Sequence, residues 1–156
     1  MVTEYQALID DFSAAIAPQR VTLMHDSWPA PHAGRKLPPG KCAVYVFSLS
    51  EMYGSNVQAG VHRVLKVGKA GSNCNARFQS QHYNVKSAPS TLAGSLIRTT
   101  VLWHYLGIKS LDISGARRWI EQNTDRDNFY IDIGDEGLLG KLEKFMKGRL
   151  GPVFEG

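Results

Sequence analysis

Residues 42–49 read Cys-Ala-Val-Tyr-Val-Phe-Ser-Leu, and residues 62–68 read His-Arg-Val-Leu-Lys-Val-Gly. Both stretches are rich in valine and in other residues that favour β-strands. A polar loop with glycine, serine and asparagine turn residues separates them at 50–60. We therefore predict two neighbouring strands that pair as an antiparallel hairpin with a long connection.

The rest of the chain surrounds this hairpin with helices and one more strand. Residues 128–133 alternate in side-chain character, which predicts a third strand. Periodicity and capping residues predict helices at 74–82, at 91–106 after Ser90, at 115–123 after Ser114, and from Asp135 to Leu150. The predicted fold class is α+β, with a small three-stranded antiparallel sheet flanked by helices.

The first 36 residues form a predicted N-terminal helical extension and connector. Residues 3–17 carry an apolar stripe at helical spacing. Residues 28–40 hold four of the seven prolines and two glycines, which predicts an irregular connector. We therefore divide the chain into this extension, 1–36, and a main domain, 37–156.

Composition and charge describe a small, weakly basic protein. The chain has 156 residues, the size of one domain, and its net charge of +4 favours polyanion binding only weakly. Cys42 and Cys74 lack the paired spacing of a zinc site, so we interpret them as reduced thiols. We find no apolar run long enough for a membrane span and no pattern of a secretory signal, so we expect a cytoplasmic protein without membrane contact.

Five polar side chains are candidates for chemistry. Tyr45 lies in the middle of the first predicted strand, and Lys66 lies in the second. Arg77 and His82 lie on the helix that follows, and Glu143 lies on the last helix. Each of these residue types alone is usually structural or simply solvated. The inference therefore depends on their order and spacing together.

This ordered set resembles the GIY-YIG nuclease family. The family's first strand carries Gly-Ile-Tyr and its second carries Tyr-Ile-Gly, where this chain has Ala43-Val44-Tyr45 and Lys66-Val67-Gly68. The later elements are an arginine after the second glycine, a histidine, and a glutamate about nine residues before a proline. In this chain they match Arg77, His82, Glu143 and Pro152. The resemblance spans residues 40–155.

The chain departs from the family pattern at three places. Lys66 stands where the family has its second tyrosine, and some restriction-type members are similar in carrying lysine at this position. His82 follows Arg77 by five residues where four is usual, so the two share a face only if the helix ends or loosens between them. The usual asparagine after the late proline is missing, and Glu155 stands in that region.

The resemblance implies a metal-dependent endonuclease that hydrolyses phosphodiester bonds in DNA, of restriction, defence, mobile-element or repair type. It implies that Glu143 holds Mg²⁺ or Mn²⁺ and that Arg77 binds the phosphate. It implies that Tyr45 is the general base. We expect Lys66 to face Tyr45 and favour its phenolate, and His82 to relay the proton onward.

Further residues are predicted to contact duplex or structured DNA. Lys69 and Gly71 lie in a glycine-containing turn, Tyr83 has a ring that could stack on a base, and Lys144 and Lys147 lie on the polar side of the last helix. The lysines also fit an ordinary solvated face. We also consider a homodimer, which could supply specificity. The alternative functions are a catalytically weak nucleic-acid-binding module on the same scaffold, and an unrelated α+β protein.

Overall fold

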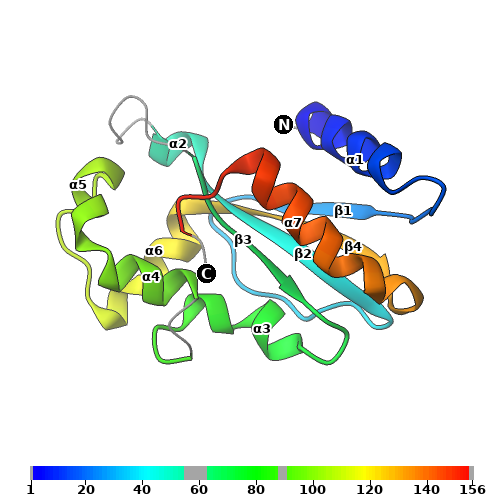
Figure 1. Cartoon of the computed structure of the whole chain (residues 1–156). Helices are drawn as coiled ribbons and strands as arrows, with labels where there is room; N and C mark the ends of the chain where they lie inside the picture. Colours follow the sequence, from blue (N-terminus) through cyan, green and yellow to red (C-terminus); the bar gives the residue numbers. More distant parts are fainter. Residues whose placement is uncertain (1, 55–62, 88–90, 155–156) are drawn as a thin grey trace.

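A four-stranded antiparallel sheet forms the centre of the computed structural model, which describes residues 2–54, 63–87 and 91–154 (Figure 1). The strands are β1 (Met24–Trp28), β2 (Lys41–Leu49), β3 (Val64–Ala70) and β4 (Thr124–Asp132), in the spatial order β1-β4-β2-β3. The α+β class and the antiparallel pairing of β2 with β3 are confirmed. His62, Glu155 and most of the predicted 50–60 loop lie outside the described residues.

The predicted number of strands was wrong, because β1 lies inside the segment 1–36 that we interpreted as an extension and connector. This strand pairs with β4 along its whole length, from Met24 opposite Tyr130 to Trp28 opposite Arg126. Its sequence, Met-His-Asp-Ser-Trp, lacks the β-branched residues that indicate a strand. Backbone pairing at a sheet edge leaves little trace in a sequence, so the strand was not recognised.

Helices cover both faces of the sheet, so that β2 is buried on both sides (Figure 1). Tyr45 and Phe47 share a core with α3 (Asn75–Gln79), α4 (Leu92–Arg98) and α6 (Ile113–Asn123). Val44 and Val46 share the other core with α1 (Val2–Ile16) and α7 (Leu139–Leu150). Neighbouring residues of β2 therefore enter different cores, as the two-residue period of a strand requires. Within the described ranges no helix has the length and apolarity that a bilayer span needs.

The predicted helix 91–106 is interrupted. It divides into α4, a 3-10 turn η2 (Thr100–Leu102) and α5 (Trp103–Leu106). The break falls at Thr99, whose backbone leaves the helical region, in a run of β-branched residues that favour helices poorly. Gly107 then ends α5 with a positive φ of 72°.

The helix ends also differ from the predicted caps. Ser90 lies outside the described residues, and Thr91 caps α4 by accepting a hydrogen bond from the Gly94 amide. Asp112, rather than Ser114, caps α6. Asp135 lies inside a 3-10 segment, η3 (Ile133–Leu138), that precedes α7. The short helix α2 (Glu51–Gly54) follows β2.

Candidate active site

Tyr45 is the centre of the candidate site, and a glycine gives its ring the space to cross the edge strand. Tyr45 lies opposite Gly68 on β3, which is an edge of the sheet. A Cβ atom at Gly68 would lie 2.7 Å from a ring carbon of Tyr45, so any other residue would displace the ring. The absence of a side chain at Gly68 therefore allows the Tyr45 hydroxyl to reach the end of β3.

Three of the predicted residues meet at the Tyr45 hydroxyl. Its oxygen lies 2.6 Å from Nε2 of His82 and 3.4 Å from the backbone carbonyl of Lys69. Arg77 donates a hydrogen bond from Nε to the same carbonyl at 3.0 Å. Arg77 is half-buried, whereas Tyr45 is 0% exposed. The arginine is therefore the more solvent-accessible of the two.

A break in the helix brings His82 to this point. The helix α3 ends at Gln79, Ser80 has non-helical dihedral angles, and a 3-10 turn η1 (Gln81–Tyr83) follows. On a continuous α-helix five residues would rotate His82 by about 140° from Arg77. Because the helix breaks between the two residues, this rotation does not apply to them. The sequence spacing required such a break if Arg77 and His82 were to lie on the same side.

Hydrogen bonds define the tautomer of His82. The Leu92 amide donates to Nδ1 at 3.2 Å, so Nδ1 carries no proton. Burial, and then the charges of Arg77, Arg126 and Lys66, hold the pKa of His82 well below its usual value, so the ring is neutral. A neutral imidazole has one N–H, which is then on Nε2 and donates to Tyr45. In this arrangement His82 is a donor to the tyrosine oxygen, unlike the proton relay that we expected.

Burial works against ionisation of Tyr45, and two arginines work for it. Burial raises the pKa of Tyr45 to about 12, and the negative charge of Glu143 acts in the same direction. The charges of Arg77 and Arg126, together with a hydrogen bond from Arg77, oppose this rise in pKa. A phenolate near neutral pH therefore needs added positive charge at the site.

Lys66 does not lie opposite Tyr45 as we expected. Its partner across the ladder is Phe47, two residue pairs along the hairpin from the Tyr45–Gly68 pair and therefore on the same face of the sheet. Lys66 is 1% exposed, and its charge acts on His82. It can therefore affect the site through its electrostatic field, but substrate cannot reach it in this conformation.

Lys69 connects Glu143 to the tyrosine. Its carbonyl accepts hydrogen bonds from Tyr45 and Arg77, and its Nζ lies 4.0 Å from the Glu143 carboxylate. Lys147 lies 3.8 Å from the same carboxylate, whose side chain is 18% exposed. Glu143 comes from α7, which packs against β3 from the other face of the sheet. Both faces therefore contribute side chains at this edge.

The chemistry of Glu143 fits a weakly held hard cation. A single carboxylate, completed by water and substrate oxygens, suits Mg²⁺. Within the described ranges no three or more histidine, cysteine or acidic side chains are grouped as a metal-binding cluster. Cys42 is buried, Cys74 is exposed, and both are free thiols. A metal at Glu143 would have to replace its contacts with Lys69 and Lys147.

The predicted nucleic-acid contacts are only partly accessible. Tyr83 is 4% exposed and its hydroxyl lies 2.8 Å from Nε2 of His32, so its ring cannot stack on a base in this conformation. Gly71 packs against the carboxylate of Glu136, whose charge disfavours a phosphate there. Lys144 is exposed on α7 and can meet a phosphate without rearrangement.

Arg126 is a site residue that we did not predict from the sequence. It lies on β4, which begins at Thr124, four residues before the predicted strand. Arg126 is 0% exposed, and its charge acts on both Tyr45 and His82. The sequence contained one sign of its burial. Arg126, Asn128 and Tyr130 are two residues apart, so on a strand their side chains lie on the same face of the sheet, and Tyr130 is buried.

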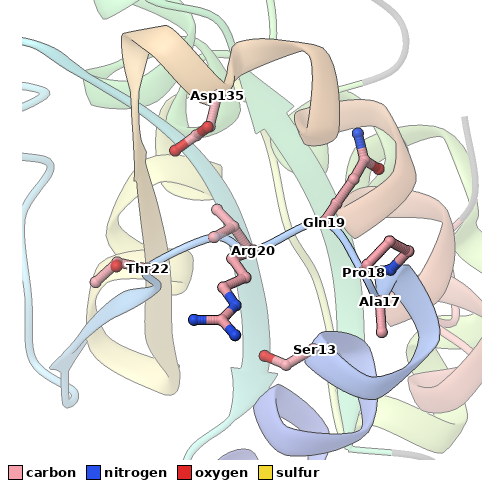
Figure 2. A pocket seen from close by; sticks show the side chains of 8 residues that line it. Ser13, Ala17, Pro18, Gln19, Arg20, Thr22 and Asp135 are labelled. Carbon is pink, nitrogen blue, oxygen red and sulfur yellow. The ribbon is translucent and has the colours of Figure 1, made fainter.

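An open hollow in the surface lies away from these residues. Its volume is about 570 Å³, and it lies between the end of α1, the segment 17–22 and η3 (Figure 2). Arg20, Thr22 and Asp135 are among its polar lining residues, as Figure 2 shows. None of the residues around Tyr45 lines it. The candidate site is therefore identified by the convergence of titratable groups at Tyr45 and not by this hollow.

No protein-family model, no curated protein and no solved structure matches this chain. The function is therefore inferred from the side chains that the fold brings together. Of these, Tyr45, His82 and Arg77 form the closest group, and Glu143 lies beside them on the other face of the sheet.

The buried side chains of His32 and His82 predict a loss of stability in mild acid. Burial, and then the charge of Arg126, lower the pKa of His32 to about 4, and the pKa of His82 is also lowered. Below a pH of about 6.5 the unfolded chain binds these protons and the folded chain does not, so stability falls as pH falls. His32 alone should reduce the free energy of unfolding by about 2 kcal/mol between pH 7 and pH 5.

Urea denaturation at both pH values measures this loss, and His32→Gln is the matched variant. We expect the variant to be less stable than the wild type at pH 7 but to lose less stability on acidification. An equal loss in both proteins would show that His32 titrates normally in the folded chain.

Proposed function

We propose that this protein is a metal-dependent nuclease that hydrolyses phosphodiester bonds in DNA. The observation that carries the proposal is the contact of the Tyr45 hydroxyl with His82 and with the carbonyl that also binds Arg77. These residues come from different elements of the fold, and each was predicted from the sequence alone. Lys69 then connects this group to Glu143.

The proposed reaction begins when a phosphate binds to Arg77. The guanidinium matches the geometry of phosphate oxygens and can offset the charge that develops on them. Arg77 bonds the Lys69 carbonyl and contacts Tyr45 in the free protein. In the proposed reaction this side chain turns outward to meet the phosphate, and the movement gives water access to the buried Tyr45 hydroxyl.

Tyr45 in its phenolate form would accept a proton from the attacking water. The water oxygen bonds to phosphorus, the phosphorus–oxygen bond to the leaving nucleotide breaks, and the leaving oxygen takes a proton from solvent. Before Tyr45 accepts the proton from the attacking water, His82 would donate its Nε2 hydrogen to the phenolate oxygen. This hydrogen bond favours the charged form and holds the ring in place.

Glu143 is the proposed ligand of Mg²⁺ or Mn²⁺. The bound ion would supply Lewis-acid stabilisation of the charge on the phosphate. Lys69 and Lys147, which are close to Glu143, would then be free to contact neighbouring phosphates, and exposed Lys144 extends this basic row along α7.

Supercoiled plasmid incubated with the purified protein and Mg²⁺ or Mn²⁺ tests the proposal. We expect nicking that EDTA abolishes. Arg77→Gln should reduce the rate by about 10²-fold, because one phosphate-stabilising donor is lost. Arg118→Gln is the matched control, because Arg118 is an exposed arginine on α6, outside the site. Equal rates for the two variants would contradict the role of Arg77.

The second candidate function is a DNA-binding module without catalysis, and the burial of Tyr45 favours it. A general base must reach its water, and Tyr45 is 0% exposed in the free protein. Plasmid, branched and single-stranded DNA should therefore all be tested for cleavage and for binding. Salt-dependent binding without cleavage by the folded wild type would support the module and reject the nuclease.

A further inference from the structure

Arg126 is a buried cation in a cage of aromatic rings. Its guanidinium carbon lies 4.4 Å from the ring centre of Phe78, 4.5 Å from Trp28, 4.6 Å from Tyr45 and 5.1 Å from Phe47. In the part of the chain that the structure describes, no carboxylate lies within ion-pair distance of it, and its Nη2 has no acceptor. A guanidinium keeps its charge in protein interiors, so this charge is largely unneutralised by its immediate neighbours.

Polar contacts hold the guanidinium in this position. Its Nε donates to Oδ1 of Asn128 at 2.8 Å, and the Asn128 amide in turn donates to Asp26 at 2.9 Å. Its Nη1 donates to the Tyr83 hydroxyl at 3.3 Å. The acid in this chain of contacts, Asp26, is thus separated from Arg126 by a neutral amide and lies toward solvent. The arrangement orients the cation without cancelling it.

Such a buried charge costs free energy, and hydrophobic residues of similar volume often replace buried ions without loss of stability. The interior would therefore gain little stability from an arginine here. The Tyr45 ring, however, lies directly over the guanidinium, and a cation in a medium of low dielectric acts strongly on an anion that forms nearby. Among the four rings of the cage, that of Tyr45 alone carries a group that can become an anion.

We propose that Arg126 is a positioning residue that stabilises the phenolate form of Tyr45 from beneath its ring. The consequence of this effect for catalysis rests on the proposed function, whereas the effect itself does not. The same charge also disfavours protonation of His82, which keeps the imidazole neutral and its Nε2 hydrogen directed at the tyrosine oxygen. Arg126 therefore supports both partners of this hydrogen bond.

Other charged and titratable groups also surround Tyr45 and Arg126, and the experiment must separate their effects on Tyr45 from the effect of Arg126. They come from β1, the segment before β2, β3, α3, η1, β4 and α7, and are Asp26, His32, Arg35, Lys66, Arg77, His82, Tyr83, Tyr130 and Glu143. Arg77 acts on Tyr45 in the same direction as Arg126, and Glu143 acts in the opposite direction. Only substitutions that change or neutralise the charge at Arg126 while keeping the net charge of the surrounding groups are informative.

Fluorotyrosine introduced at position 45 gives a direct measurement. Its phenol is more acidic than that of tyrosine, so it titrates at a pH where the chain is folded, and its ¹⁹F signal reports position 45 alone. We expect Arg126→Met to reduce the phenolate fraction at a given pH by about tenfold or more, which is one unit of pKa. Arg126→Lys retains the charge and should reduce it less. An unchanged titration in folded Arg126→Met overturns the proposal.

Asn128→Asp provides a second variant if Arg126→Met does not fold. It is combined with Asp26→Asn, so that the hydrogen bond between positions 26 and 128 is kept with its direction reversed and the net charge is unchanged. The carboxylate then lies at Nε of Arg126, so the cation is retained but neutralised. We expect the same direction of change in the ¹⁹F titration. If the phenolate fraction stays at the wild-type value in this variant, the charge of Arg126 does not act on Tyr45 and the proposal is wrong.

Cleavage assays distinguish this proposal from the proposed function. The ¹⁹F titration needs no substrate, so a shifted titration with no cleavage by the wild type would reject the nuclease and retain the role of Arg126. Cleavage by the wild type, together with a titration that Arg126→Met does not shift, would retain the nuclease and reject the role of Arg126. If both hold, the rate of Arg126→Met at pH 7 should fall by about tenfold or more, and fluorotyrosine at position 45 should restore part of it.

Discussion

Tyr45→Phe is expected to reduce plasmid cleavage by about 10²–10⁴-fold while the protein stays folded, because a general base contributes a factor of this size. The substitution removes one oxygen atom from a fully buried ring. It leaves the Nε2 hydrogen of His82 without its acceptor, which should cost about 1–3 kcal/mol of stability. The loss of activity should therefore greatly exceed any change in the folded fraction.

Tyr105→Phe is the matched control for this substitution. Tyr105 is 49% exposed on α5 and belongs to the helical segment outside the site. Rates measured with excess plasmid, together with urea denaturation of both variants, separate catalysis from folding. Near-normal cleavage by Tyr45→Phe would reject Tyr45 as the general base, whereas equal losses in both variants would show a general effect of tyrosine substitution.

The hairpin of β2 and β3 could be predicted from the sequence because its evidence is local. Strand-forming residues and a polar loop define the two strands, and antiparallel pairing follows from their being neighbours. The place of Gly68 under Tyr45 also follows from this pairing once the register is known. The ladder contains a register shift between Phe47 and Ser48, however, and no residue type there indicates it.

The environment of the site could not be predicted, because it depends on elements that come together from distant parts of the chain. In the sequence, Arg126 lies between a predicted helix and a predicted strand, where an arginine is normally solvated. Its burial requires β1, which brings Trp28 opposite it across the ladder, and α3, which brings Phe78. The tautomer of His82 likewise depends on the first residue of α4.

Glu143→Gln is expected to reduce cleavage by about 10²–10³-fold, since a bound metal supplies several kcal/mol of stabilisation to the transition state. The amide has nearly the same shape as the carboxylate, and the ion pairs that it breaks are partly exposed to solvent, so stability should change by about 1 kcal/mol or less. Glu121→Gln is a close control, because Glu121 is a helical glutamate with a 23% exposed side chain that pairs with Arg117.

The direction of this effect separates two roles of Glu143. Its negative charge disfavours the phenolate of Tyr45, so its removal alone would help Tyr45 to ionise and would raise the rate at neutral pH. A lost metal ligand would lower the rate, and the loss should be smaller at saturating Mn²⁺. Cleavage measured across a range of Mg²⁺ and Mn²⁺ concentrations therefore gives opposite results for the two roles. A faster Glu143→Gln variant would remove Glu143 from the metal site and leave it as a charge that restrains Tyr45.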